Sequence, residues 1–140
     1  MTRALAFVFL VGCAGSSNEP PGLGGPGDCS VLGCDADQVC TREGACLPPD
    51  QVRAVHVTWT VSGAAASATS CAGALDLELG LQGRGVGGFS FAPVPCVEGA
   101  FTVDRLSKAY DRVELGREQS RDVQTASIDA TGDAALNLPY

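Results

Sequence analysis

The sequence predicts an all-β protein: a small antiparallel β-sandwich over residues 52–140, preceded by a disulfide-rich mini-module and a disordered tether. Three observations support this prediction. From Val52 onward, apolar and polar residues alternate in about seven short segments, and no helical repeat stands out. Six cysteines lie between residues 29 and 96, where they can pair with one another. A stretch rich in Gly, Ser and Pro precedes them.

Residues 1–12 have the pattern of a signal peptide for export. Arg3 supplies a positive charge, and an apolar run of eight residues follows from Ala4 to Val11. A helix that crosses a membrane needs about 20 residues, so this run is too short to be a transmembrane segment. We therefore expect the chain to leave the cytoplasm.

The apolar run ends at Leu10-Val11-Gly12-Cys13. This resembles a bacterial lipobox, in which Leu, a small or aliphatic residue, and Gly or Ala precede a Cys. The resemblance implies cleavage between Gly12 and Cys13, a diacylglyceryl group on the Cys13 sulfur and an acyl chain on the new N-terminus. Two or more acyl chains hold a protein stably on a membrane, whereas one holds it only marginally. The alternative is an unmodified cysteine beside an ordinary signal peptide.

The resemblance also implies a location. It predicts a protein of the cell envelope that is anchored to a membrane through Cys13, with its folded part periplasmic or surface-exposed. Ala14 follows the cysteine, and by the enteric sorting rule this implies the outer membrane. Residues 13–28 are predicted to be a flexible tether, because Leu23 is the only large apolar residue among them and so little surface can be buried.

Residues 29–49 are predicted to be a four-cysteine module. Its cysteines are Cys29, Cys34, Cys40 and Cys46. So short a segment cannot bury a core of its own, so we expect disulfides to hold it together. Residue spacing alone leaves three connectivities open. The segment resembles small Cys-rich modules of exported bacterial proteins, and that resemblance implies the pairs Cys29–Cys40 and Cys34–Cys46.

Two metal-binding interpretations of this module have less support. Structural zinc sites have closely spaced cysteine pairs separated by a longer loop, whereas the gaps here are nearly even. Asp35 and Asp37 match the start of an EF-hand loop, but position 39 is Val and the Gly and Glu of that loop are missing. We therefore expect neither a bound metal nor a cofactor.

The strands of the sandwich follow from residues that alternate in polarity. In Val55–Val61 every second residue is apolar, with Trp59 facing the core and His56 facing away. The next strand is expected to begin at Cys71. In an extended strand this residue would point to the same side as the four leucines that follow at every second position, Leu75, Leu77, Leu79 and Leu81. Later strands are expected at residues 89–91, 101–103 and 110–115, with a closing hairpin formed by 123–128 and 135–138. The charged run 111–122 is predicted to be a solvated edge strand and loop, with a partner-binding face as the alternative.

Cys71 and Cys96 are left to pair with each other and are expected to staple the sandwich. Closing a loop of about 25 residues contributes roughly 3.5 kcal/mol in the chain-entropy model. The segments VHVTWTV, SCAGALDLELGL and VPCVEGAFTVDRL, together with the strand at Tyr110, resemble carboxypeptidase-regulatory-like or prealbumin-like sandwich domains of bacterial lipoproteins. The resemblance implies an Ig-like or prealbumin-like sandwich with an accessory, surface or scaffolding role.

No catalytic residue can be assigned from the sequence. The net charge of −7 offers no basic patch for a nucleic acid. His56 is the only histidine, and neither a nucleophile elbow nor a P-loop is present. We therefore expect a non-enzymatic, membrane-anchored lipoprotein with a structural or interaction role and an unidentified envelope protein or glycan as partner.

Two alternatives remain open. A carbohydrate- or peptidoglycan-binding module would present an exposed aromatic pair or a concave face. A small hydrolase would need His56 to lie beside a serine and a carboxylate in a pocket.

Overall fold

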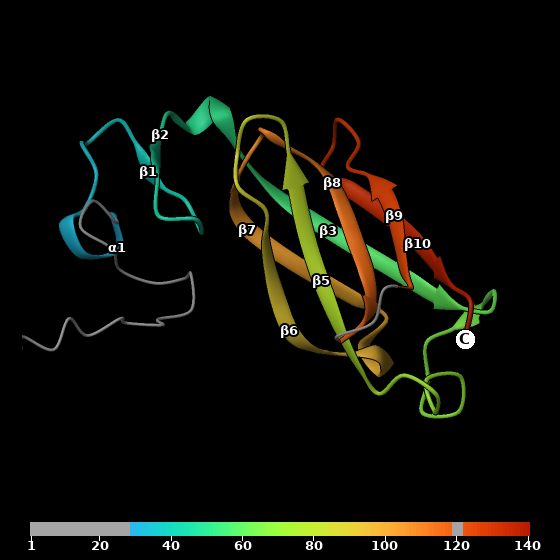
Figure 1. Ribbon diagram of the computed structural model, residues 1–140. Helices are drawn as coiled ribbons and strands as arrows, with labels where there is room; N and C mark the ends of the chain where they lie inside the picture. The colour runs from blue at the N-terminus through green and yellow to red at the C-terminus, as the bar shows by residue number, and fades with distance from the viewer. Residues whose placement is uncertain (1–28, 119–121) are drawn as a thin grey trace, which may run out of the picture.

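The computed structural model describes residues 29–118 and 122–140, which form a β-sandwich with the four-cysteine module at one end (Figure 1). The predicted signal peptide, Cys13 and the tether lie outside the described residues. In chain order, the elements are α1 (Cys29–Leu32), β1 (Val39–Cys40), β2 (Cys46–Leu47), η1 (Pro49–Gln51), β3 (Val52–Val61), β4 (Ala64–Ala65), β5 (Asp76–Gly83), β6 (Phe89–Pro95), η2 (Cys96–Glu98), β7 (Ala100–Ser107), β8 (Tyr110–Arg117), β9 (Val123–Ser127) and β10 (Asp133–Leu138). Because the helical elements are single short turns, the prediction of an all-β fold is confirmed.

Two four-stranded sheets make up the sandwich. In one sheet, β3 pairs with β10 along one edge and with β7 and the short β4 along the other. The second sheet has the order β6-β5-β8-β9 and is antiparallel throughout. Figure 1 shows the β5 and β8 strands in front of β3 and β7, as expected for one sheet packed on another.

One strand pair departs from the predicted antiparallel arrangement. β10 runs parallel to β3, with Asp133 opposite His56 and Leu138 opposite Val61. The predicted hairpin of residues 123–128 and 135–138 is therefore wrong, because β9 pairs with β8 while β10 crosses to the other sheet. The turn between them makes this crossing, since the Asp129 carboxylate accepts hydrogen bonds from the backbone N–H groups of Thr131, Gly132 and Asp133.

The start of the second strand also differs from the prediction. Leu77, Leu79 and Leu81 are fully buried, as predicted, but Leu75 is 64% exposed. Residues 67–74 form successive turns, in which the Cys71 N–H donates to the carbonyl of Ser67. The strand begins only at Asp76, so the alternation that links the leucines to Cys71 is broken by these turns.

The charged segment after Tyr110 is not an edge strand. β8 lies between β5 and β9, so the prediction of an edge strand over residues 111–122 is wrong for this part. Its charged residues alternate with Val113 and Leu115, which are fully buried. A central strand can carry this many charges because the outer face of an antiparallel sheet is solvated.

The core lies between the two sheets and contains the side chains that the alternation predicted. Its buried residues from β3 are Val55, Val57, Trp59 and Val61. The indole N–H of Trp59 donates to the Cys96 carbonyl at 2.9 Å, so this buried polar group is satisfied. The leucines of β5 and the buried residues of β8 form the opposite side of the core, and β10 contributes Ala134, Leu136 and Leu138 from the sheet of β3. Burying each such side chain contributes about 1.5–3 kcal/mol, which makes apolar burial the main stabilising contribution to the sandwich.

Candidate functional site

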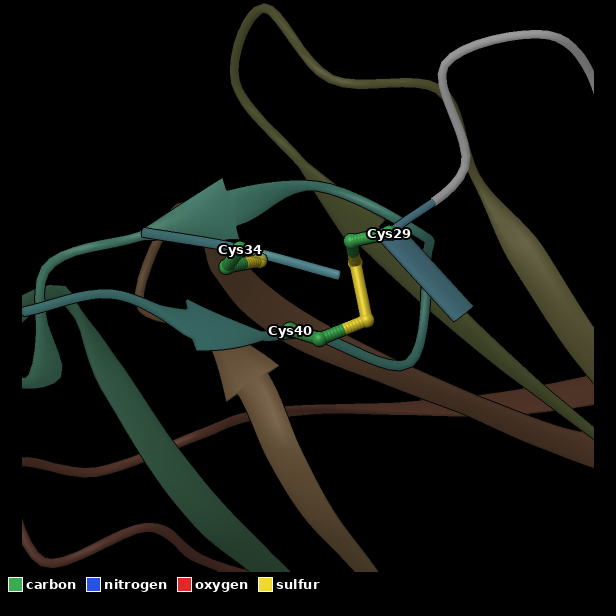
Figure 2. Close-up of side chains that lie close together, drawn as sticks. All are labelled: Cys29, Cys34 and Cys40. Carbon is green, nitrogen blue, oxygen red and sulfur yellow. A yellow bond between two sulfur atoms is a disulfide. The ribbon is translucent and has the colours of Figure 1, made fainter. Parts of the chain in front are cut away.

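The four cysteines of the module form two interlaced disulfides. Cys29 bonds to Cys40 and Cys34 bonds to Cys46, the pairs that the resemblance to small Cys-rich modules implied. Figure 2 shows the Cys29–Cys40 bond with the Cys34 sulfur nearby. The sulfurs of Cys29, Cys34 and Cys40 lie within 4.8 Å of one another, which is close enough for three free thiolates to bind one metal ion. All of them are already used in disulfides, whereas a zinc site requires thiolates.

The acidic residues of the module are not gathered around an ion site. Asp35 and Asp37 are exposed, and the Asp35 carbonyl accepts a hydrogen bond from the Gln38 N–H in a turn. Within the described residues, the cysteine group is the one cluster of three or more potential metal ligands. The partial EF-hand pattern therefore corresponds to loop carboxylates in solvent.

The module is docked on the sandwich through the edge strand β7, a contact that the sequence did not predict. Arg42 forms an ion pair with Asp104, in which Arg42 Nε donates to Asp104 Oδ1 at 2.6 Å. The Arg42 backbone N–H donates to the Arg105 carbonyl, and the Ser107 N–H donates to Glu43 Oε1. These contacts use part of the unpaired backbone of β7, which would otherwise be open to pairing with another chain.

Two side chains near the contact between the module and the sandwich have shifted pKa values. The hydrogen bond from Arg42 lowers the pKa of Asp104, and the charges of Arg42 and Arg105 act in the same direction. Burial raises the pKa of Tyr110, and the negative charge of Glu43 adds to this effect. The Tyr110 hydroxyl donates to the Gly87 carbonyl at 2.9 Å, which fixes the loop after β5.

The third disulfide lies inside the sandwich. Cys71 and Cys96 are fully buried and bonded to each other, as expected for the staple of this domain. They join the turns of residues 67–74 to η2 at the end of the sandwich away from the module. The pairing leaves no unpaired cysteine among the described residues.

His56 lines a surface pocket of about 280 Å³, which we call the His56 pocket. Ser127, Asp129 and Asp133 also line it, so the residue types required by the hydrolase alternative are near one another. This grouping could not be read from the sequence, because it depends on the crossing of β10 to the sheet of β3. The remaining lining residues are small or apolar apart from Thr58.

The hydrogen bonds of the His56 pocket are not those of a catalytic triad. His56 Nδ1 lies 2.9 Å from the hydroxyl oxygen of Thr102, and no described residue forms a hydrogen bond with the Ser127 hydroxyl. Asp129 accepts the Thr131 hydroxyl and several backbone N–H groups, and the Thr131 hydrogen bond lowers its pKa. A triad needs the nucleophile, base and acid linked in series by hydrogen bonds. Here His56 bonds to Thr102, Asp129 bonds to groups of its own turn, and the Ser127 hydroxyl bonds to no described residue.

A second and larger cavity lies on the outer face of the β6-β5-β8-β9 sheet. It has a volume of about 380 Å³, and we call it the outer-face groove. Its lining residues are Glu78, Gly80, Gln82, Gly88, Phe89, Ser90, Glu114, Arg117 and Val123. The volume is within the range of about 300–1,000 Å³ found for small-ligand pockets. The sequence singled out Glu114 and Arg117 only as members of the charged run 111–122, and it gave no sign that they would meet Glu78 and Gly80 in a groove.

None of the helices in residues 29–118 and 122–140 has the length and apolar character needed to pass through a bilayer. Comparison with known proteins gave no significant match to any protein-family model, curated protein or solved structure.

Proposed function

We propose that this chain is an exported bacterial lipoprotein, anchored in the cell envelope through Cys13, with a non-catalytic structural or interaction role. The observation that carries the proposal is the disulfide pattern. Three disulfides in a chain of this size are typical of an oxidising compartment outside the cytoplasm. They use six of the seven cysteines, and the remaining one, Cys13, is the cysteine of the LVGC motif.

The same motif supports the proposed location. Lipidation at Cys13 would attach the chain to a membrane, and Ala14 favours the outer membrane. The proposed tether is formed by the 15 residues between Cys13 and Cys29, the first cysteine of the module. A flexible segment of that length reaches on the order of 20 Å, enough to hold the sandwich clear of the lipid headgroups.

We further propose that the sandwich is of the carboxypeptidase-regulatory-like or prealbumin-like kind. The strand order supports this choice over a constant-type immunoglobulin domain. In that domain the first, second, fourth and fifth strands share a sheet. Here the first long strand, β3, shares a sheet with β7 and β10.

Two observations favour an interaction role over chemistry. The His56 pocket lacks the linked hydrogen bonds of a triad, and the outer-face groove lies on an open sheet face, with Phe89 and Val123 among its mostly polar and glycine lining. The concave face gives some support to the carbohydrate-binding alternative. However, Phe89, the aromatic residue that lines this groove, is partly buried and packs edge-on against Phe91 and Tyr110, whereas sugar rings are usually stacked on an accessible aromatic ring.

The test of the anchor is membrane fractionation in a bacterium that makes lipoproteins. We expect the wild-type chain in the membrane fraction, resistant to washing with high salt and released by detergent. The Cys13→Ser variant is expected in the soluble fraction of the envelope, with all three disulfides formed. If both chains fractionate with the membrane in the same way, Cys13 is not the anchor.

A further inference from the structure

Gly80 lies in β5, an inner strand of its sheet, where neither a positive φ nor a steric clash requires a glycine. It lies within β5, opposite Ser90 on one neighbouring strand and Glu114 on the other. Its φ is not positive, and an added Cβ would come no closer than 3.6 Å to the Cβ of Glu114, an ordinary contact. Gly116 in the adjacent strand differs, because a Cβ there would lie 2.7 Å from the carbonyl oxygen of Asp122.

A glycine inside a strand weakens it by about 0.5–1 kcal/mol relative to alanine. The register of β5 is irregular between Leu77 and Leu79 and again between Gln82 and Gly83, but Gly80 itself is regularly paired between these two points. Where no turn, bulge or close backbone contact explains it, a strand glycine often marks the close approach of a ligand. Gly80 is also the floor of the outer-face groove, between Glu78 and Gln82 along β5. The missing side chain therefore forms a notch at the centre of the largest cavity described above.

The polar side chains around this notch have no partners among the described residues, and two of them, Glu78 and Glu114, are carboxylates that only accept hydrogen bonds. Glu78, Gln82 and Glu114 are half-buried, and Ser90 is exposed. Within the described residues, none of their side chains forms a hydrogen bond or an ion pair. Arg117 is the cation that lines the groove, and its guanidinium lies over the Tyr140 ring, 4.2 Å from the ring centre. Both carboxylates are thus left available to an incoming group.

These features define the chemistry of the missing ligand. Carboxylates form their strongest hydrogen bonds with cationic N–H donors, and a planar guanidinium presents five such donors in a fixed arrangement. The net charge of −7 would attract a basic partner to this surface. We propose that the outer-face groove binds an arginine side chain of a partner protein, with the guanidinium over Gly80 and between Glu78 and Glu114.

This inference deepens the interaction role proposed above by naming the chemistry of the partner, but it does not depend on the lipid anchor. Failure of lipidation at Cys13 would leave the groove unchanged. Loss of binding at the groove would leave membrane attachment unchanged. The two proposals are therefore tested by separate results.

The experiment is an NMR titration of the oxidised full-length chain, kept in solution with a nonionic detergent. The probes are N-acetyl-arginine amide and N-acetyl-citrulline amide, which have nearly the same shape but differ in charge. We expect the arginine probe to shift the amide signals of Glu78, Gly80, Ser90 and Glu114. The citrulline probe is expected to bind at least about tenfold more weakly, because it lacks the charge that the carboxylates recognise.

Two variants test the site itself. Gly80→Val fills the notch with a side chain that strands favour, so the fold is retained while arginine binding falls by at least about tenfold. The double variant Glu78→Gln/Glu114→Gln removes both carboxylates, and we expect a similar loss. Its matched control is Asp50→Asn/Glu98→Gln, which changes the net charge equally at exposed positions outside the groove. That control should retain wild-type affinity.

Three results would overturn the proposal: equal binding of citrulline and arginine, shifts spread over the whole acidic surface, or undiminished binding by Gly80→Val. A chitooligosaccharide that shifts the groove amides when arginine does not would also overturn it and favour the carbohydrate alternative. Equal binding of N-acetyl-lysine amide would likewise overturn it, because a planar guanidinium would then have no advantage over a simple cation in this groove.

Discussion

The four-cysteine module and the sandwich are held together in different ways. Among the described side chains of the module, only Cys29 and Thr41 are buried, and Val31 and Leu32 of α1 are 72% and 74% exposed. The sandwich instead has a continuous core between its sheets and a single disulfide. The comparison indicates that covalent bonds replace a core in the module, whereas in the sandwich a disulfide is added to a core that already exists.

The strongest test of this difference removes the module's disulfides. In the variant with serine at Cys29, Cys34, Cys40 and Cys46, we expect the module to unfold while the sandwich remains folded. Each bond closes a loop of 11 or 12 residues in sequence separation. In the chain-entropy model each bond is worth about 3 kcal/mol. Hydrogen exchange should become fast over residues 29–47 and stay slow in β3, β5 and β8. Cooperative unfolding of both parts together would contradict the comparison.

The next largest effect is expected from the core of the sandwich. Leu79→Ala should lower the free energy of unfolding by about 2–5 kcal/mol, because it leaves a cavity between the sheets. Leu75→Ala is the matched control, since this leucine is 64% exposed and four residues earlier. We expect it to change the stability by less than about 0.5 kcal/mol. Denaturant unfolding measures the free energy of unfolding of both variants. Equal losses of stability would contradict the placement of Leu79 in the core and of Leu75 at the surface.

The smallest effect is expected at the contact between the module and the sandwich, where Arg42 forms an ion pair with Asp104. We call this contact the joint. Because the Arg42 hydrogen bond lowers the pKa of Asp104, the contact should be fully formed above the unfolded pKa of about 4. It should weaken as the pH falls through the lower folded pKa. Hydrogen exchange at Arg42 and Ser107 should therefore accelerate in acid while the core stays protected.

The control for this pH dependence is Asp104→Asn. This variant should show fast exchange at Arg42 already at neutral pH, with little further change on acidification. Because the pair is solvent-exposed, we expect the global stability of the variant to be nearly that of the wild type. A wild-type joint that does not respond to acid would mean that backbone contacts alone hold the module.

The parts of the fold that could be predicted from the sequence are those decided locally. The alternation in Val55–Val61 predicted β3 and the burial of Trp59, because burial on one face of a strand determines which residues point inward. Strand pairing is decided by distant residues, and this is why the crossing of β10 to β3 was missed. Leu75 matched the alternation of its neighbours, but the turns before β5 removed it from the strand.

The candidate sites were harder to predict for the same reason. The cysteines could be assigned to a module and a staple, since their number and spacing limit how they pair. The outer-face groove depends on Gly80, Ser90 and Glu114 meeting across three strands. A glycine within an alternating pattern indicates only a weakness of one strand until its neighbours are known. The contact of Arg42 with Asp104 joins residues 62 positions apart and leaves no local pattern.

The most direct test of the proposed function is the intact mass of the protein extracted from membranes with detergent, before and after reduction. We predict a chain that begins at Cys13 and carries a diacylglyceryl group and an N-acyl chain. Reduction should add the mass of two protons for each of three disulfides. An unlipidated chain with a free thiol at Cys13 would contradict the anchor. It would leave the three disulfides as the remaining argument for a compartment outside the cytoplasm. A mass that reduction does not change would reopen the zinc interpretation of the module, because its cysteines would then be free thiols.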